Sequence, residues 1–173
     1  TRMKYQSLIQ ICDYLQSKKF ISHIKRAGDN LFKICFDGDE TLFFDMDKTS
    51  SNIHKNAAFI ESKTYKAPFD VVLAKRFVKS KILKIAVPQN NRILSLRAEL
   101  SAGYKRLVSE IHFEFTGRFT NVIITDEAGV ILEALRHFDN DFRSIRVGKK
   151  LIPLPPREIK EQKTARIGDF SAF

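Results

Sequence analysis

The chain has 173 residues and a formal net charge of +10, with 43% hydrophobic and 29% charged residues. This length suits one domain, or one domain with a tail, and the large apolar fraction excludes wholesale disorder. No stretch approaches the ~18 apolar residues of a membrane-spanning helix. The start, Thr1-Arg2-Met3-Lys4, carries no apolar signal region, so we expect a cytoplasmic protein without a membrane partner, and Met3 is a candidate initiator.

The positive charge is concentrated in one part of the chain. Residues 67–100 hold seven basic and two acidic side chains, a net +5 that is half of the total excess. A concentrated positive field attracts polyanions, and nucleic acid is the commonest polyanion in a cytosol. A soluble protein that is merely basic has the same composition, so charge alone leaves both interpretations open.

The first part of the chain predicts one helix and a short antiparallel meander. Residues 5–18 place apolar side chains at the i, i+3, i+4, i+7 spacing of a helical stripe, namely Leu8, Ile11, Cys12 and Leu15. The runs 20–25, 31–36 and 41–44 have strand character and are joined by short turns rich in Gly and Asp. Residues 45–66 are polar and lack a pattern, so we expect a long surface excursion.

A second helix and further strands follow. Pro68 is expected at the first helical position, with Asp70 in the first turn, and the face opposite the apolar stripe carries Lys75, Arg76 and Lys79. The β pattern then returns over residues 82–87, 92–96, 107–115, 121–125 and 130–135, with a turn at 126–129. These elements predict an α+β fold with mainly antiparallel strands, sandwich-like, and two main helices.

Two domain-level expectations complete this outline. Residues 1–152 are expected to form the domain, and residues 153–173, which begin with Pro153-Leu154-Pro155-Pro156 and continue charged, are typical of a linker or tail. Cys12 and Cys35 lie in apolar runs, so we interpret them as free thiols in preference to a disulfide or a pair of ligands.

The motifs of enzymes and metal sites are missing. The histidines have no cysteine or carboxylate at ligand spacing, so we expect no metal and no cofactor. A Gly-x-Ser-x-Gly elbow and a glycine-rich phosphate loop are absent as well. Glu110 and Glu114 share one face of a predicted strand, where such a pair is usually solvated or salt-bridged, whereas acid–base catalysis requires a pocket. We therefore expect that the chain is not an enzyme.

The most informative segment is residues 115–124, Phe-Thr-Gly-Arg-Phe-Thr-Asn-Val-Ile-Ile. A turn that carries Gly117 and Arg118 between two apolar strands exposes backbone amides together with a guanidinium. That combination suits contact with a phosphate, which an arginine can bind through two parallel hydrogen bonds. The alternative is a hairpin turn whose arginine is merely solvated, and these residues alone favour that alternative.

Several ordered segments together resemble a known family. The run Glu114-x-x-Gly117-Arg118-x-x-Asn121, followed by Arg136-His137, resembles the amino-terminal domain of the NFACT family, also called fibronectin-binding protein A-like. The helix that begins with Pro68-Phe69, the segment 89–93, Arg146 and Pro155-Pro156 match in the same order, so the resemblance covers roughly residues 3–156.

The resemblance implies a fold and a function. Family members are ribosome-associated quality-control factors that bind the large ribosomal subunit carrying peptidyl-tRNA and recruit tRNA for untemplated tailing of the stalled chain. The resemblance therefore implies an RNA-binding domain. It also implies a fold similar to the amino-terminal domain of formamidopyrimidine-type DNA glycosylases, and further domains downstream of the linker.

The resemblance also implies a tRNA- or RNA-binding site. The positions that match the family's motifs are Asn91, Arg92, Glu114, Gly117, Arg118, Asn121, Arg136, His137 and Arg146. Lys75, Arg76 and Lys79 are expected to add longer-range electrostatic attraction. The family's Asp-Arg pair appears here as Asn91-Arg92, and asparagine keeps an acceptor and gains donors but loses the charge. Alternatively, Asn90-Asn91 only forms a turn.

Two other functions compete with this hypothesis. A DNA glycosylase of this type uses an amino-terminal proline with an adjacent glutamate, but the earliest proline here is Pro68, which leaves at most a DNA-binding, glycosylase-like domain without catalytic residues. A fibronectin-binding adhesin, which the family's older name suggests, needs an export signal that the start of the chain does not carry. Fibronectin is therefore the less favoured partner.

Overall fold

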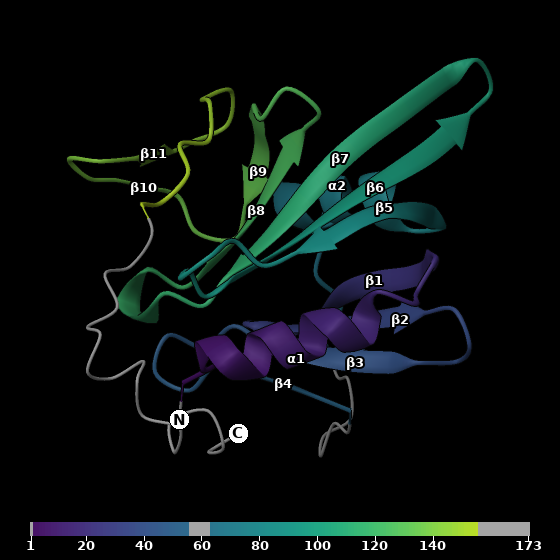
Figure 1. The fold of residues 1–173 in the computed structure, drawn as a ribbon. Helices are drawn as coiled ribbons and strands as arrows, with labels where there is room; N and C mark the ends of the chain where they lie inside the picture. The colour runs from purple at the N-terminus through teal and green to yellow at the C-terminus, as the bar shows by residue number, and fades with distance from the viewer. Residues whose placement is uncertain (1, 56–62, 156–173) are drawn as a thin grey trace.

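The computed structural model describes residues 2–55 and 63–155. Nine strands form one antiparallel sheet in the order β4-β3-β2-β1-β5-β6-β7-β8-β9 (Figure 1). Their bounds are β1 Phe20–Gly28, β2 Leu31–Phe36, β3 Thr41–Asp45, β4 Asn52–His54, β5 Ser80–Ala86, β6 Ile93–Ala102, β7 Lys105–Glu114, β8 Asn121–Asp126 and β9 Ile131–Ala134. The helices α1 (Tyr5–Leu15) and α2 (Pro68–Phe77), the 3-10 turn η1 (Gly117–Phe119) and a hairpin of β10 (Phe138–Asp139) and β11 (Ser144–Ile145) complete the fold.

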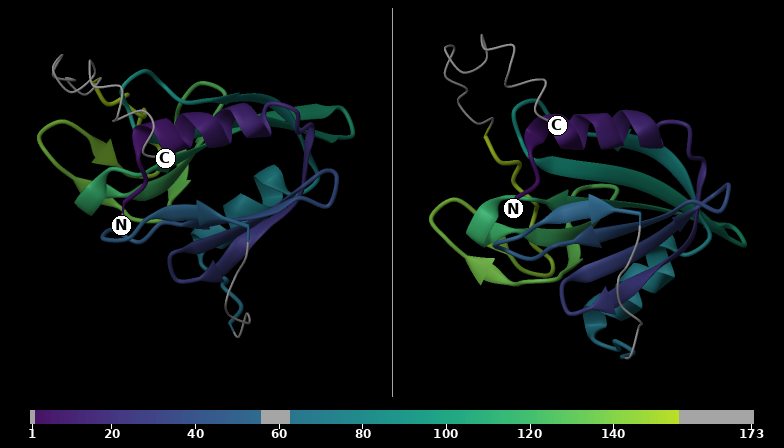
Figure 2. Two further views of the ribbon diagram at one scale, coloured as in Figure 1. Left: turned by 60° about the horizontal axis from the view of Figure 1, so that its bottom comes forward. Right: turned by 90° about the horizontal axis from the view of Figure 1, so that it is seen from below.

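The sheet bends where β1 meets β5. Only two residue pairs join these strands, Phe20 with Lys81 and Ile21 with Ser80. The half formed by β1–β4 and the half formed by β5–β9 therefore face each other across the core. Helix α1 closes one open side of this sandwich and α2 lies on the opposite side (Figures 1 and 2).

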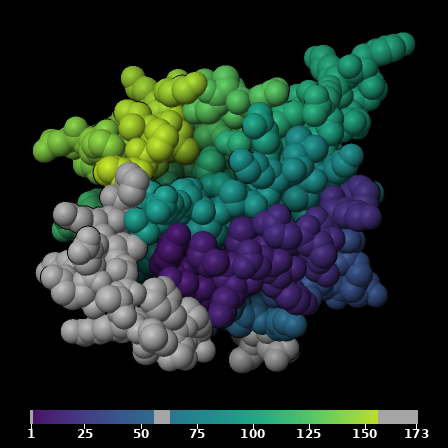
Figure 3. Space-filling model, viewed as in Figure 1, coloured from purple at the N-terminus to yellow at the C-terminus, as the bar shows by residue number. Residues whose placement is uncertain are grey.

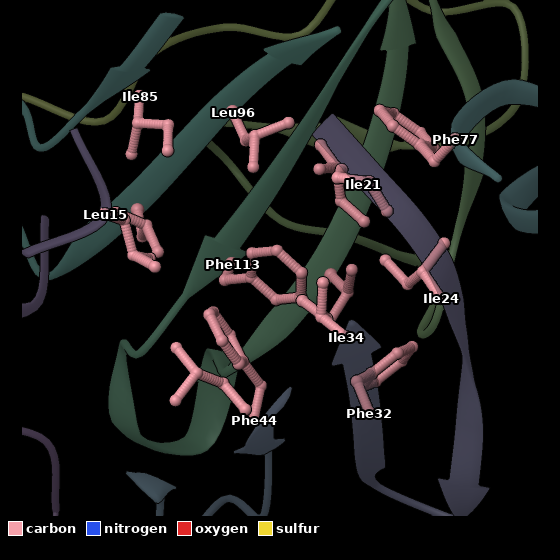
Figure 4. Packing of buried hydrophobic residues seen from close by; sticks show 14 of the residues in the cluster. Leu15, Ile21, Ile24, Phe32, Ile34, Phe44, Phe77, Ile85, Leu96 and Phe113 are labelled. Carbon is pink, nitrogen blue, oxygen red and sulfur yellow. The ribbon is translucent and has the colours of Figure 1, made fainter. Parts of the chain in front are cut away.

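Phenylalanine rings fill much of the space between the two halves. The rings of Phe44 and Phe113 have centroids 4.5 Å apart, and Phe32 meets Phe113 edge-on at 6.2 Å (Figure 4). Phe69 from α2 adds a second edge-on contact with Phe32 at 5.8 Å. Edge-on and tilted pairs at these distances add stabilisation beyond the buried area. The aromatic pairs therefore tie both sheet halves and α2 into one core.

Alternation along β7 separates this core from a polar outer face. Ile111 and Phe113 are fully buried in the core, so Glu110, His112 and Glu114 point to the other side of the sheet. Strand β8 is buried on both faces because a second apolar cluster covers its outer side. That cluster consists of Ile123, Ile131, Ala134 and Ile145, with Phe138 and Leu151 packed against it.

The predicted α+β class is confirmed, as are the antiparallel strands and the helix that begins at Pro68. The strand predicted over residues 92–96 was too short, because β6 continues to Ala102 and pairs with β7 in a long hairpin. Residues 101–106 at the tip of this hairpin are all exposed and their strands pair only with each other, so no buried face imposes an apolar alternation there. The predicted excursion over residues 45–66 contains the short edge strand β4, and its part at 56–62 lies outside the described residues.

The structure also bears on the predicted thiols and on the predicted tail at residues 153–173. Cys12 is buried, Cys35 is half-buried, and both are free thiols, as predicted. Of the predicted tail, only residues 153–155 fall within the described part of the chain. Neither α1 nor α2, the helices found in the described segments, is long and apolar enough to span a membrane.

Candidate functional site

A groove of 420 Å³ opens where β6 begins, between η1 and the β10–β11 hairpin. Arg92 lines it from the start of β6, Phe119 from η1, and Phe142 and Arg143 from the hairpin loop. Phe119 and Phe142 expose 41% and 49% of their surface, so both rings are accessible from the groove. The groove thus combines guanidinium groups with accessible aromatic rings.

The segment Asn91-Arg92 forms one wall of this groove. Asn90 has a φ of +62°, and the amide of Asn91 donates to the Pro88 carbonyl at 3.3 Å, so the turn expected of these asparagines is present. The Asn91 side chain does more than close the turn, because its Nδ2 donates to the Leu154 carbonyl at 3.1 Å. The half-buried Arg92 donates from Nη1 to the Met3 carbonyl at 3.4 Å and also faces the groove.

The Gly117-Arg118 turn borders the groove as a single turn of 3-10 helix. Gly117 has a φ of +65°, a conformation that favours glycine, and its carbonyl accepts hydrogen bonds from the Thr120 amide at 2.9 Å and the Thr120 hydroxyl at 2.6 Å. Arg118 is exposed, and its guanidinium lies 4.8 Å from the centre of the Phe119 ring. The ring of Phe119 in turn packs 5.6 Å from that of Phe138. An exposed cation is therefore stacked on Phe119, an accessible ring that lines the groove.

Asn121 and Arg136 hold this turn in place from inside. Asn121 is fully buried; its Oδ1 accepts from the Arg136 amide at 2.9 Å and its Nδ2 donates to the Arg136 carbonyl at 2.8 Å. The Arg136 guanidinium donates to the Thr120 carbonyl, to Asn30 Oδ1 at 2.7 Å and to the Met46 carbonyl at 3.1 Å. Burial lowers the pKa of Arg136 from its usual value. Both residues shape the turn and link it to the opposite sheet half.

Glu114 is occupied by a partner that the sequence did not indicate. Its carboxylate accepts two hydrogen bonds from Arg143, at 2.8 Å from Nη1 and 2.9 Å from Nη2, and both residues are almost fully buried. Nε of Arg143 donates to the Ile152 carbonyl at 2.9 Å. The pair fixes the hairpin loop against β7, and Glu114 offers no accessible oxygen to a ligand in this arrangement. Phe119, Phe138, Phe142 and Arg143 are among the groove residues that were not predicted as site residues from the sequence.

Among the predicted residues, Asn91 and Arg92 line the groove itself, and Gly117, Arg118, Asn121 and Arg136 form or hold the adjoining turn. The remaining predicted residues lie away from the groove. His137 is exposed and contacts Glu133 at 2.8 Å, and Arg146 on the hairpin pairs with Asp139 at 3.1 Å. On α2, Lys75 is exposed, Lys79 lies just beyond the helix end with a φ of +63°, and Arg76 donates to Ser109 Oγ at 3.2 Å. The described lining residues of the groove all come from outside α2, so the basic helix is a separate surface. Within residues 2–55 and 63–155, no three His, Cys, Asp or Glu side chains converge as a metal site would require.

Comparison with known structures shows the fold. The chain is similar to the N-terminal domain of the fibronectin-binding protein PavA from Streptococcus pneumoniae, with a TM-score of 0.77 and 20% identity over 91% of this chain and 65% of that one. It is also similar to the N-terminal part of the fibronectin/fibrinogen-binding protein of Streptococcus suis, with a TM-score of 0.78 and 17% identity over 87% and 60%. For the fibrinogen-binding protein of Staphylococcus aureus, the values are 0.71 and 16% over 86% and 55%.

The chain therefore spans between 55% and 65% of the length of these structures. No curated protein sequence matches it. A family model does match, and it covers residues 21–172, which is most of the chain. On this match the chain belongs to the family described by the NFACT N-terminal and middle domains.

Proposed function

We propose that the groove between Arg92 and Phe119 binds RNA, as the tRNA-recruiting part of a ribosome-associated quality-control factor that engages the large subunit carrying peptidyl-tRNA. The observation that carries this proposal is a groove lined by Arg92 and two accessible phenylalanine rings, with Arg118 stacked on one of these rings, Phe119. Membership of the NFACT family supports it.

The chemistry of the groove favours single-stranded RNA. Guanidinium groups grip phosphate through paired hydrogen bonds, and exposed aromatic rings stack unpaired bases. Phe119 and Phe142 line the groove, and Arg118 stacks on Phe119. An unpaired loop or end of a tRNA meets these requirements better than a regular duplex, whose bases are already stacked. In this proposal the domain is a binding module without catalytic residues of its own.

Replacing Arg92 by alanine is expected to weaken tRNA binding by about 1–3 kcal/mol, the usual worth of a specific arginine contact. Fluorescence anisotropy with labelled tRNA measures the change in affinity, and a thermal melt of the same variant checks the fold. Arg106→Ala is a matched control, because Arg106 is largely exposed near the tip of the β6–β7 hairpin that projects from the body (Figure 3). It removes one guanidinium charge and should change the affinity little.

If the Arg92→Ala variant binds tRNA as tightly as the unchanged domain, Arg92 is not part of the binding site. If the unchanged domain does not bind tRNA at all, the proposal is wrong. Two of the similar structures belong to proteins named for binding fibronectin, so the same domain should be passed over immobilised fibronectin. Saturable binding to fibronectin without binding to tRNA would favour the adhesin instead.

The basic helix is expected to contribute only long-range attraction. Changing Lys75 and Lys79 together to glutamine should weaken tRNA binding similarly for all sequences. The slope of log affinity against log salt should fall by about 0.7–0.9 for each phosphate that the variant no longer neutralises. Arg76 is left in place because it also bonds to Ser109. A control with Lys105 and Arg106 changed to glutamine removes two charges from the hairpin tip, and an equal fall in that control would show that α2 has no special role.

A further inference from the structure

A recess of 270 Å³ lies on the outer face of β6–β8, directly beside the groove. The two cavities share Asn91, Arg143 and Leu154 as their common boundary. The segment 151–154 contributes Leu151, Pro153 and Leu154 to the lining of the recess. Three hydrogen bonds hold that segment, from Leu151 N to the Gly129 carbonyl at 2.8 Å, from Arg143 to the Ile152 carbonyl and from Asn91 to the Leu154 carbonyl.

The register of the strands gathers polar side chains in this recess. Ser95 on β6 lies opposite His112 on β7, and Glu110 on β7 lies opposite Thr125 on β8. Ser95 Oγ and His112 Nδ1 are 2.7 Å apart and satisfy each other. Burial, with a smaller contribution from the nearby Arg143, lowers the pKa of His112 to about 4, so the imidazole is neutral near pH 7.

Two polar groups in the recess are left for a ligand. The Thr125 hydroxyl is completely buried and has no hydrogen-bond partner within the described part of the chain. A buried hydroxyl without a partner is costly, and native structures usually satisfy it. The carboxylate of Glu110 forms an ion pair with Arg97, at 3.7 Å from Nη1, and lies 3.6 Å from His112 Nε2. Both distances are longer than a hydrogen bond, so the carboxylate oxygens can still accept one. A carboxylate only accepts hydrogen bonds, so the missing partner is an N–H or O–H donor.

The shape and walls of the recess narrow the ligand class. Its volume is just below the usual range of drug-sized pockets, which suits a single ring system. Ile93, Leu151 and Pro153 supply apolar walls for a flat ring. The recess adjoins the groove. A base of an RNA strand bound in the groove would therefore need to cross only the boundary at Asn91 and Leu154 to reach the recess.

We infer that the recess takes one unpaired base of the RNA bound in the groove, and that Glu110 and Thr125 select a base with an exocyclic amine over uracil. Adenine, cytosine and guanine each carry an amine that donates to a carboxylate, whereas uracil presents a carbonyl at the corresponding position of cytosine. This inference rests on the proposed RNA-binding function and adds a base preference to it.

The test compares oligocytidine with oligouridine of the same length at pH 7.5, since these differ at the amine-bearing edge of the base. The unchanged domain is expected to bind oligocytidine at least about fivefold more tightly, the lower end of what one well-made base contact discriminates. Glu110→Gln should abolish the preference and keep the affinity for oligouridine, because the amide can also donate. Thr125→Val, which replaces the hydroxyl by a methyl group of similar size, should reduce the preference by a smaller factor.

Glu127→Gln is the matched control. Glu127 also lies 3.7 Å from Arg97, but it is two-thirds exposed and does not line the recess, so its substitution should leave the preference intact. Equal binding of both oligonucleotides by the unchanged domain, or a preference that survives in Glu110→Gln, would overturn the inference and leave RNA binding standing. If neither oligonucleotide nor tRNA binds, the proposed function and this inference fail together.

Discussion

Replacing Arg143 by methionine is expected to lower the free energy of unfolding by about 3–5 kcal/mol, the usual cost of leaving one member of a buried ion pair alone. Arg143 is 5% exposed and Glu114 is 2% exposed, so water does not solvate the carboxylate that the substitution strands. The substitution also removes both hydrogen bonds to Glu114 and the one to the Ile152 carbonyl. Urea denaturation, monitored by circular dichroism, measures the free energy of unfolding.

A double variant separates the cost of the stranded charge from the value of the pair. Changing Glu114 to leucine in the Arg143→Met background removes the unpaired carboxylate, and apolar replacements of whole buried pairs are often neutral or stabilising. The double variant should therefore recover most of the stability. A single variant less than about 1 kcal/mol below the unchanged domain would mean that water reaches Glu114, as it does at exposed ion pairs.

The ion pair also shows why the sequence predicted only part of the site. Glu114 and Arg143 are 29 positions apart, and no periodic pattern links them. An acidic residue between Phe113 and Phe115 indicated only that one face of β7 is polar. Arg143 lies in the loop between β10 and β11, and the position of this loop depends on the second apolar cluster. No local sequence pattern predicts such a cluster, because its members come from separate elements of the chain.

The fold was more predictable where local rules decide it. Pro68 at the first turn and the apolar stripe after it specify α2, and alternation with short turns specifies the meander β1–β3. The rules fail at the tip of the β6–β7 hairpin, residues 101–106, which has no packed face, and in β10 and β11, which are two residues long each. Elements that depend on pairing alone carry little apolar signal.

The structure gives a reason for one departure from the family's motif. Asn91 stands where the family has aspartate, and its Nδ2 donates to the Leu154 carbonyl. An aspartate there would bring a carboxylate oxygen against that carbonyl, and neither group donates. Asparagine at position 91 therefore suits the position of segment 151–154 in this chain. Asn91→Asp should weaken the contact that separates the groove from the recess.

Lowering the pH from 7 to 4 is expected to cost the domain on the order of 3 kcal/mol through His112 alone. The ordinary pKa of histidine is 6.5, and burial lowers that of His112 to about 4. Between these values the unfolded chain binds a proton at His112 that the folded domain does not. The stabilising effect of the neutral imidazole is thus complete above pH 6.5, declines as the pH falls, and is gone below about 4.

Urea denaturation at pH 7, 6, 5 and 4 measures this decline, and His112→Gln is the control. Glutamine has no titrating group and can still accept the Ser95 hydroxyl, so its stability should change less over the same range. Asp37, Asp47 and Asp139, whose pKa values hydrogen bonds lower, act mainly below this window, and Asp45, whose pKa burial raises, acts in the opposite direction near its end. These carboxyls are common to both proteins, so their effects cancel in the difference. If the free energy of unfolding depends on pH in the same way in both proteins, the expectation is contradicted. His112 would then take up its proton in the folded domain at no cost, which would mean that water reaches the imidazole.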